Sequence, residues 1–455
     1  MATFTGGSWR PLTWSGGYYA ENVFEGLAGA PGTWYLDRQQ GLLYYHPLPG
    51  EDPATCEVIA PATEQLVRFA GDAAAGRLVR NITLRGLSFQ HTDWPLAAAG
   101  FAVPQADLPA PAAVTAEGAV GCRWEGCRFQ HLGAWGLELR RGCRENSIVR
   151  CTLSDLGAGG VKLGEPENAQ ADCDETCRTL IADNRISDTN RVYLGSPAVW
   201  VGQSSQNTIS HNEISGPAMW AISLGWTWSY FPLQRARDNI VEFNHCHDLG
   251  MGPLGTHCAI YALGTSPGTI IRNNYVHHVA ASSFWPGAGE GIILDNGCCG
   301  IRVEDNVVHD AVAGGFGTNF NCFGNVIVNN VFAYGKEYQL TVYGDAPTGK
   351  PQPKGEIFAR NIVIWQDGPL IKEADWPSFG TLWDYNLYWQ ADGQPVKFMK
   401  YSWDEWHAKD LDTHSLVADP LFVDAKQRNF TLRPESPAFG LGFRSIDLSK
   451  VGPRP

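Results

Sequence analysis

Residues 291–310 read GIILDNGCCGIRVEDNVVHD, and this stretch sets the pattern for much of the chain. Its first half is an apolar run that ends in an acid, Ile292-Ile293-Leu294-Asp295, and a glycine turn follows. Its second half, residues 301–308, alternates apolar and polar side chains around Asn306. A period of two is typical of a β-strand with one buried face. The stretch therefore predicts two strands joined by a tight turn.

Copies of the second half recur along the chain, and each contains one asparagine within a β-branched or apolar run. These asparagines are 24 to 32 residues apart and are Asn184, Asn212, Asn244, Asn274, Asn306, Asn330, Asn361 and Asn386. Such a period is the sequence signature of stacked repeats. One copy cannot bury its apolar face alone, so the copies must share a core, and stacked amides can satisfy one another inside it. We therefore predict an all-β protein, a right-handed parallel β-helix, rather than independent hairpins.

Three regions of the chain differ in pattern. Residues 1–78 contain two strand-like pieces, 33–36 and 42–46, and predict a small β subdomain that caps the N-terminal end. Residues 79–400 carry the repeats and predict the β-helix. Residues 401–455 lose the pattern and predict a C-terminal cap, because the open end of such a stack is an exposed sheet edge.

The composition limits the possible partners. The net charge of −13 argues against a nucleic acid or an anionic membrane surface, and no apolar run is long enough to span a membrane. The 12 cysteines show no zinc-site spacing, so we expect no metal and no other cofactor. The 17 tryptophans and 15 tyrosines suit a carbohydrate-facing surface, although aromatic rings also fill protein cores. We expect a monomer that binds a glycan.

Several segments resemble those of known proteins: WYLDRQQGLLYYHPLPGEDP, RNITLRGLSF, GAGGVKLGE, ISLGWTWSY, AIYALGTSPGTIIRNNYVHH and GIILDNG. They are similar to segments of secreted β-helix proteins that degrade glycans, in particular glycoside hydrolase family 141, which includes α-L-fucosidase and xylanase activities. The resemblance runs from about Trp34 to Gly452. It implies a hydrolase that cleaves glycosidic bonds of a polysaccharide or oligosaccharide in a groove along the β-helix. It also implies a secreted or periplasmic location, although no signal peptide is visible in this chain.

The resemblance further implies two catalytic aspartates. One matches Asp295, which is followed by Asn296 where the family has a glutamate. The other position holds Thr256, whose hydroxyl cannot replace an acid at neutral pH. From the residues alone, Asp295 could instead cap a turn through its own backbone, a common role for aspartate.

Glycoside hydrolysis needs a second carboxylate about 5 to 10 Å from the first. Because neighbouring coils lie about 4.8 Å apart, an acid from a nearby coil or loop could supply it. Our first choice is Asp345, which follows a partial match of the family pattern at Gln339. The alternatives are Glu290, Glu337 and Asp310.

The expected substrate contacts lie in the matched segments and in one inserted loop. Trp226 and Trp228 form either a platform for a sugar or a hydrophobic lid. Tyr261, His257 and Gln339 are expected to contact the substrate because they lie in or beside the matched motifs.

Histidines recur near the asparagines of the repeats: His211, His245, His247, His277, His278 and His309. They could bind a metal or supply the base of a lyase, but we expect them to be hydrogen-bonded members of the stack. Two other functions remain open, a polysaccharide lyase and a catalytically silent glycan-binding β-helix, the second because of the threonine at position 256.

Overall fold

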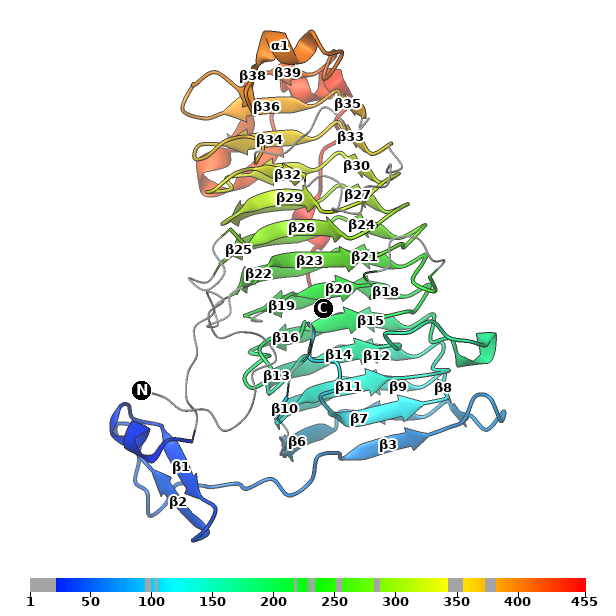
Figure 1. The fold of residues 1–455 in the computed structure, drawn as a ribbon, viewed down its shortest axis with the longest axis vertical. Coiled ribbons are helices and arrows are strands. Elements are labelled where there is room, and N and C mark those ends of the chain that lie inside the picture. The colour runs from blue at the N-terminus through cyan, green and yellow to red at the C-terminus, as the bar shows by residue number, and fades with distance from the viewer. Residues whose placement is uncertain are drawn as a thin grey trace. The chain divides into compact units, whose positions relative to one another are not determined.

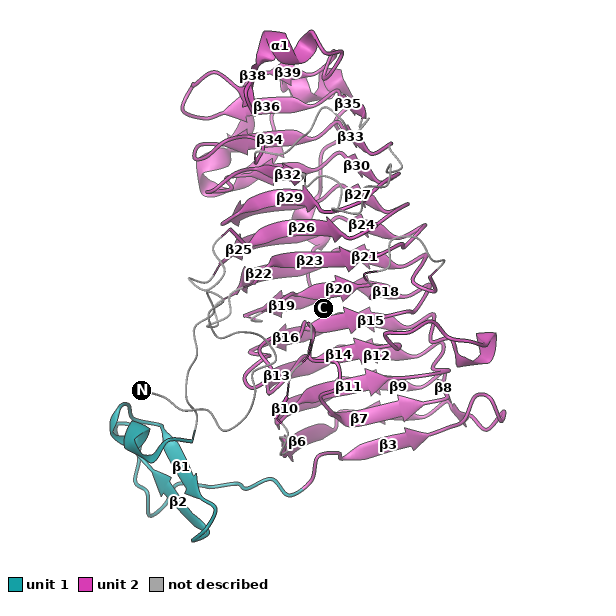
Figure 2. Cartoon of the chain, in the orientation of Figure 1, with its two compact units in different colours: residues 1–62 teal, residues 63–455 magenta. Residues whose placement is uncertain are grey.

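The structure is a computed structural model that describes residues 22–455 except 95–99, 102, 104, 217–218, 227, 229–233, 251–255, 282–286, 343–354 and 373–381. The chain divides into two compact units, residues 1–62 and residues 63–455 (Figure 2).

The smaller unit contains a β-hairpin. Strands β1 (Trp34–Asp37) and β2 (Leu42–Tyr45) pair antiparallel and coincide with the strand-like pieces of the sequence. The 3-10 helix η1 (Phe24–Ala28) adds Phe24, whose ring packs edge-on against two tyrosines of the hairpin at 5.3 Å.

The larger unit is built from three long parallel sheets (Figure 1). The 10-stranded sheet consists of β3 (Val67–Ala70), β7 (Ala112–Glu117), β11 (Trp135–Leu139), β14 (Val161–Leu163), β17 (Val199–Val201), β20 (Ile222–Leu224), β23 (Cys258–Leu263), β26 (Glu290–Asp295), β29 (Gly314–Thr318) and β32 (Leu340–Val342). The 11-stranded sheet consists of β5 (Thr83–Arg85), β9 (Arg123–Glu125), β12 (Ser147–Val149), β15 (Leu180–Ala182), β18 (Thr208–Ser210), β21 (Ile240–Glu242), β24 (Ile270–Arg272), β27 (Arg302–Glu304), β30 (Val326–Val328), β33 (Ile357–Ala359) and β35 (Leu382–Asp384). The 12-stranded sheet consists of β6 (Ser88–Thr92), β10 (Arg128–Leu132), β13 (Thr152–Leu156), β16 (Arg185–Ser187), β19 (Glu213–Ser215), β22 (His245–Leu249), β25 (Tyr275–Val279), β28 (Val307–Ala311), β31 (Val331–Ala333), β34 (Ile362–Trp365), β36 (Leu387–Gln390) and β39 (Leu416–Val417).

One strand from each sheet makes one coil, and each strand pairs in parallel with its counterpart one coil later. Strand β26, for example, pairs with β23 before it and with β29 after it. Two short strands, β4 (Val79–Arg80) and β8 (Ala119–Val120), pair in the same way at a corner of the first coils. The parallel β-helix predicted from the sequence is confirmed.

The β-helix begins earlier and ends later in the chain than the repeats indicated. Strand β3 lies within the predicted N-terminal subdomain, residues 1–78, yet it pairs with β7. Strand β39 lies within the predicted C-terminal cap, residues 401–455, yet it pairs with β36. Terminal repeats are atypical because they face the end of the stack rather than another copy, and so their sequences depart from the pattern.

The repeated asparagines form a continuous buried ladder. Each side-chain amide oxygen accepts from the main-chain N–H of the residue that occupies the equivalent position one coil earlier, as Asn274 does for Asn244. From Asn184 to Asn386 the side-chain amides also bond to one another, at 2.9 to 3.3 Å. Buried polar groups are costly unless paired, and here every coil supplies the partner for the next.

The residue before each ladder asparagine adopts a left-handed backbone conformation. Its φ lies between 53° and 61° at Asp183, His211, Phe243, Asn273, Asp305, Asn329, Arg360 and Tyr385. Non-glycine residues reach this region at a cost, so the ladder hydrogen bonds offset the strain of turning the chain within two residues.

A second, shorter ladder was not foreseen. Asn146, Asn207, Asn239 and Asn325 each lie immediately before a strand of the 11-stranded sheet, and all four are buried. Asn207 bonds to Asn239 through both its main-chain and its side-chain nitrogen. Other residues take the position in other coils, among them Thr179, Thr269, Ile301 and Glu356, so no regular asparagine period marked it in the sequence.

The C-terminal region closes the ladder and then returns along the coils. Asn386 donates to the buried carboxylate of Asp412, which also accepts from the indole N–H of Trp406 in α1 (Trp403–His407). The chain continues through β37 (Lys397–Phe398), β38 (Tyr401–Ser402), β40 (Phe422–Asp424), β41 (Asn429–Leu432) and the 3-10 helices η4 (Ala425–Gln427), η5 (Pro437–Leu441) and η6 (Leu448–Lys450). Near its end Arg454 pairs with Asp183, 271 residues earlier. Within the described residues no helix is long and apolar enough to cross a membrane.

Removal of one ladder amide should destabilise the β-helix. We expect Asn274→Leu or Asn306→Leu to lower the free energy of unfolding by about 1–3 kcal/mol, because the partners one coil away lose buried hydrogen bonds. Urea or thermal unfolding measures the change. Asn429→Leu, at an exposed position, is the control. If the ladder variants unfold at the same temperature or urea concentration as the parent, the ladder does not stabilise the fold.

Candidate active site

Two acids, Glu290 and Asp295, stand at the two ends of strand β26, and both are buried. Between them Ile292 and Leu294 point into the core of the β-helix, whereas Ile293 packs with side chains on the outer face of the 10-stranded sheet. Successive side chains of a strand usually alternate between faces, so Asp295 shares the outer face with Ile293. The alternation breaks at Gly291, because a Cβ there would overlap the core side chain of Val308 and so faces inward like Ile292. Glu290 therefore lies on the outer face as well.

Asp295 is held by two donors. The hydroxyl of Tyr261 on β23 donates to one carboxylate oxygen at 2.5 Å, and the amide of Asn296 donates to the other at 2.5 Å. Burial raises the pKa of Tyr261 well above its ordinary value, and the negative charge of Asp295 raises it further. The phenol therefore keeps its proton and acts as a hydrogen-bond donor to Asp295.

Glu290 has a different environment. The hydroxyl of Tyr338 donates to its Oε1 at 2.7 Å, while within the described part of the chain Oε2 has no hydrogen-bond partner. Burial raises the pKa of Glu290 to about 7, although the Tyr338 hydrogen bond and the charge of Lys372 act in the opposite sense. A carboxyl group of this kind can hold a proton at neutral pH and release it to a reacting oxygen.

A glycine lets Tyr338 reach Glu290 across the coil between them. Gly314 pairs with Glu290 in the sheet. A Cβ on Gly314 would lie 2.9 Å from the ring of Tyr338, closer than side-chain atoms approach one another. The missing side chain therefore makes room for the ring, and the Nζ of Lys372 lies 4.7 Å from its centre.

Thr256 and His257 immediately precede strand β23, which carries Tyr261. The His257 ring is centred 6.1 Å from that of Tyr261, and burial lowers the pKa of His257 although the charge of Asp295 raises it. The Thr256 hydroxyl is buried and donates to the carbonyl of Cys258 at 2.8 Å. An aspartate carboxylate in place of Thr256 could not donate this bond.

The charges of both carboxylates affect the pKa of one buried thiol, that of Cys258. Burial raises the pKa of Cys258 well above its ordinary value, and the charges of Glu290 and Asp295 raise it further. Both carboxyl groups therefore lie close enough to Cys258, the first residue of β23, to affect it electrostatically. Because the two acids are five residues apart on one strand, their Cα atoms are at most about 16 Å apart, and the side chains must lean together to act on one bond.

Of the second acids considered from the sequence, Glu290 is the one that lies on the strand of Asp295. Asp345 lies outside the described residues. Asp310 lies on β28 of the 12-stranded sheet, where Arg428 binds both of its oxygens at 2.6 Å. Glu337 is exposed. The sequence pointed to Glu290 only through its position at the start of an apolar run. Its burial could not be predicted, because the residues that bury it come from other coils.

The expected substrate contacts differ in exposure. Trp226 is buried and packs edge-on against Trp200, with ring centres 6.0 Å apart. Trp228 is 42% exposed and its ring centre lies 4.9 Å from that of Trp226. Gln339 is buried, and its amide is bonded to the main chain of Gly335 and Asp367. The three side chains therefore do not form one continuous platform.

A hollow lies elsewhere on the 10-stranded sheet. It has a volume of about 400 Å³, and its lining includes Arg68, Glu138, Arg140 and Lys162 but none of the predicted site residues. The amino group of Lys162 is already bonded to Glu138 and to the carbonyls of Leu108 and Ala110. This lysine therefore anchors a loop rather than offering a free charge.

Five of the six repeat histidines form side-chain hydrogen bonds in the 12-stranded sheet, namely His245, His247, His277, His278 and His309. The Nδ1 of the sixth, His211, has no partner within the described residues. His245 contacts His277 through their Nε2 atoms at 2.8 Å, and burial lowers the pKa of His245 to about 4 and that of His277 to about 3. Glu213, His245 and His247 form the one group within the described ranges whose ligand atoms could hold a metal. This group lies on a different sheet from Glu290 and Asp295.

The chain is similar to known β-helix proteins. Residues 172–348 match the family described as "Right handed beta helix region". Among solved structures, the chain is similar to one described as "Glycoside hydrolase", with 23% identity and a TM-score of 0.58 over 66% of this chain and 56% of that chain. The matched segment contains both acids of β26, and these likenesses show that the β-helix is right-handed. A search of curated sequences finds no similar protein.

Two more distant structures also match. One is the periplasmic alginate epimerase AlgG, with 12% identity and a TM-score of 0.44 over 74% of each chain. The other is the tailspike protein of E. coli bacteriophage HK620 in complex with a pentasaccharide, with 12% identity and a TM-score of 0.45 over 72% of this chain and 60% of that chain. The chain spans little more than half the length, 56%, of the solved glycoside hydrolase.

The two tryptophans of the inserted loop should respond differently to substitution. Trp226→Ala should lower the free energy of unfolding by about 3–5 kcal/mol because it empties a packed site. Trp228→Ala should change it by less than about 0.5 kcal/mol, as is usual at an exposed position. If Trp228 contacts sugar, its loss weakens binding in affinity electrophoresis on polysaccharide gels. Unchanged binding to every glycan that the parent retains would exclude Trp228 from the binding surface.

Proposed function

We propose that the protein is a carbohydrate-active hydrolase that cleaves glycosidic bonds on the outer face of the 10-stranded sheet. The observation that carries the proposal is the pair of buried carboxyl groups on β26, which differ in the number of hydrogen bonds that they accept. Burial raises the pKa of Glu290 to about 7, and Asp295 accepts hydrogen bonds from Tyr261 and Asn296. One proton donor and one carboxylate are the groups that glycoside hydrolysis requires.

In this proposal Glu290 donates its proton to the oxygen of the leaving sugar. Asp295 acts on the opposite side of the sugar ring, where it takes a proton from the attacking water. Tyr261 and Tyr338 are positioning residues, since each orients one carboxyl group through a hydrogen bond.

The fold supports this assignment at a coarser level. In each coil of a parallel β-helix, every second side chain of a strand points outward. Because the coils stack, these side chains form a long surface along which an extended polysaccharide can lie. The solved structure described as a glycoside hydrolase has the same fold. The family assignment to glycoside hydrolase family 141 is part of the proposal, with Thr256 replacing one family aspartate and Glu290 supplying the missing acid.

Neutralising either acid should abolish cleavage. On a panel of plant and microbial polysaccharides, Glu290→Gln and Asp295→Asn should each lower kcat by about 10²–10⁴-fold, the usual contribution of a positioned acid or base. Reducing-end release measures the activity, and Glu145→Gln, at an exposed corner, is the control. Full activity of both variants would exclude this site.

The two rival functions give different results in the same assay. A polysaccharide lyase would produce an unsaturated product with ultraviolet absorbance, whereas a hydrolase would not. A silent glycan-binding protein would bind members of the panel without releasing reducing ends. If either result is obtained with the native protein, hydrolysis is wrong.

The activity should fall above neutral pH. Because the pKa of Glu290 is raised from 4.5 to about 7, its protonated fraction falls about tenfold per pH unit above that value. The folded state also holds a proton that the unfolded state has released between these two values, so the contribution of Glu290 to stability decreases as the pH rises through this range. The pH profile of kcat/KM tests the first point.

Glu356 provides the control for this profile. Burial raises its pKa to about 7 as well, but its carboxyl group accepts from Asn325 at the second ladder. Glu356→Gln should therefore keep the alkaline fall in activity. If Glu356→Gln lost the alkaline fall in activity, the group that titrates would be Glu356 and not Glu290.

A further inference from the structure

The outer face of the 12-stranded sheet carries a group of ligand atoms that the proposed hydrolysis does not use. Glu213 on β19 pairs in register with His245 on β22, and His247 lies two residues further along β22. Side chains two apart on a strand share a face, and cross-strand neighbours lie about 5 Å apart. The three side chains therefore form a triangle, with their ligand atoms within 4.8 Å of one another.

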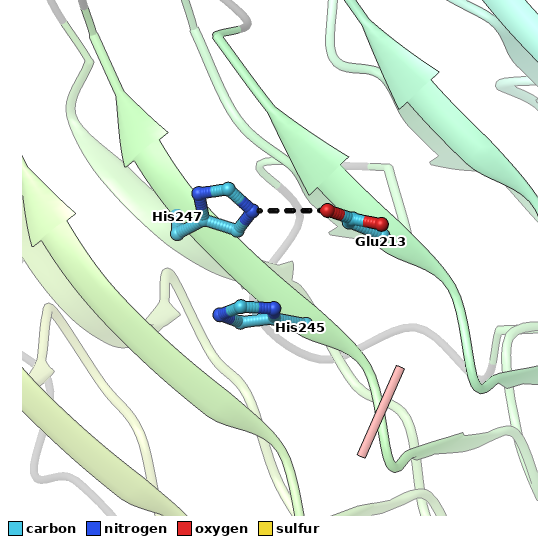
Figure 3. A group of neighbouring side chains, drawn as sticks. All are labelled: Glu213, His245 and His247. Carbon is cyan, nitrogen blue, oxygen red and sulfur yellow. Dashed lines mark ion pairs between the residues drawn. The ribbon is translucent and has the colours of Figure 1, made fainter. Parts of the chain in front are cut away.

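Figure 3 shows the imidazole of His247 pointing toward the carboxylate of Glu213, with the ring of His245 beside them. The Nε2 of His247 lies 3.6 Å from Oε1 of Glu213, and this buried nitrogen makes no hydrogen bond within the described residues. The gap is too long for a hydrogen bond, and two atoms at this distance can both contact one cation between them.

The other nitrogen of each imidazole is already engaged. Asp248 lies 2.7 Å from Nδ1 of His247, and the Nε2 of His277 lies 2.8 Å from Nε2 of His245. This leaves Nε2 of His247 and Nδ1 of His245 for a cation. Histidines that bind metals have this arrangement, since the outer partner fixes the ring and its tautomer.

We propose that Glu213, His245 and His247 bind a divalent transition-metal cation such as Zn²⁺. Two imidazoles and one carboxylate suit zinc and its neighbours, whereas Ca²⁺ and Mg²⁺ prefer sites made of oxygen atoms. The carboxylates of Glu213 and Asp248 compensate the charge, although Arg185 pairs with the second oxygen of Glu213. The cation would join two adjacent coils and keep at least one position open to solvent, because the side chain of Glu213 is 30% exposed.

His309, two coils further along the same sheet, does not offer the same opportunity. His309 is bonded at Nδ1 to Asp310 at 2.6 Å and at Nε2 to the hydroxyl of Tyr275 at 2.8 Å. Both of its ring nitrogens are therefore satisfied by protein groups. The open nitrogen of His247, beside a carboxylate and a second imidazole, distinguishes the proposed site from His309.

The test is a titration of chelator-treated, full-length protein with ZnCl₂ by isothermal calorimetry, with thermal unfolding in parallel. The parent should bind one equivalent and melt at a higher temperature when zinc is present, because a ligand of the folded state stabilises it. Glu213→Gln and His247→Phe should each weaken binding by about 100-fold or more, and Asp248→Asn by about 10–100-fold. Unfolding without metal checks that each variant folds.

The control variant is His131→Asn, which removes a histidine that pairs with Asp155 at 2.6 Å on the same sheet but has no third ligand. It should bind zinc like the parent. Cobalt substitution distinguishes this site from the 12 free cysteines, because coordination by nitrogen and oxygen lacks the near-ultraviolet thiolate band. The proposal is wrong if the parent binds no zinc, if the thiolate band appears, or if Glu213→Gln and His247→Phe bind as tightly as His131→Asn.

Discussion

The hydrogen bond from one coil's main-chain N–H to the asparagine of the next coil is the constraint on which the rest of the structure depends. It occurs at a corner where the preceding residue is held in the left-handed region, as at Phe243 before Asn244. The chain can turn there within two residues only because a buried amide satisfies the groups that the turn leaves free. Since every amide also bonds to the next, the ladder fixes the register of all three sheets at once.

A fixed register turns each outer face into rows of aligned side chains, one from every coil. On the 10-stranded sheet this alignment places Tyr261 where it can donate to Asp295, and Tyr338 where it can reach Glu290. On the 12-stranded sheet the same rule places Glu213 opposite His245. Chemistry on both faces therefore arises from residues 30 to 50 positions apart in sequence, because neighbouring coils bring them together.

The two acids of β26 illustrate how a β-helix differentiates similar groups. Both are buried, yet Asp295 accepts from two donors while Glu290 accepts from one and keeps an oxygen without a partner among the described residues. Burial penalises a charge unless hydrogen bonds replace the lost water. Glu290, with one donor from another coil, thus has its pKa raised by burial to about 7.

The sequence by itself determined the repeat, the buried asparagine ladder, the parallel β-helix and Asp295 as a residue of interest, because these follow from local period and from one matched motif. The tertiary structure favoured Glu290, one of the alternatives considered from the sequence, over Asp310 and Glu337. It alone showed that Trp226 is buried, that a second ladder exists and that Glu213 lies beside two histidines. These features depend on which side chains from other coils surround a residue. Glu290 owes its raised pKa to burial, and it owes its hydrogen bond to a tyrosine 48 residues away that passes over Gly314. No local pattern encodes such a neighbour, since the loops between coils vary in length while the stacking distance stays constant.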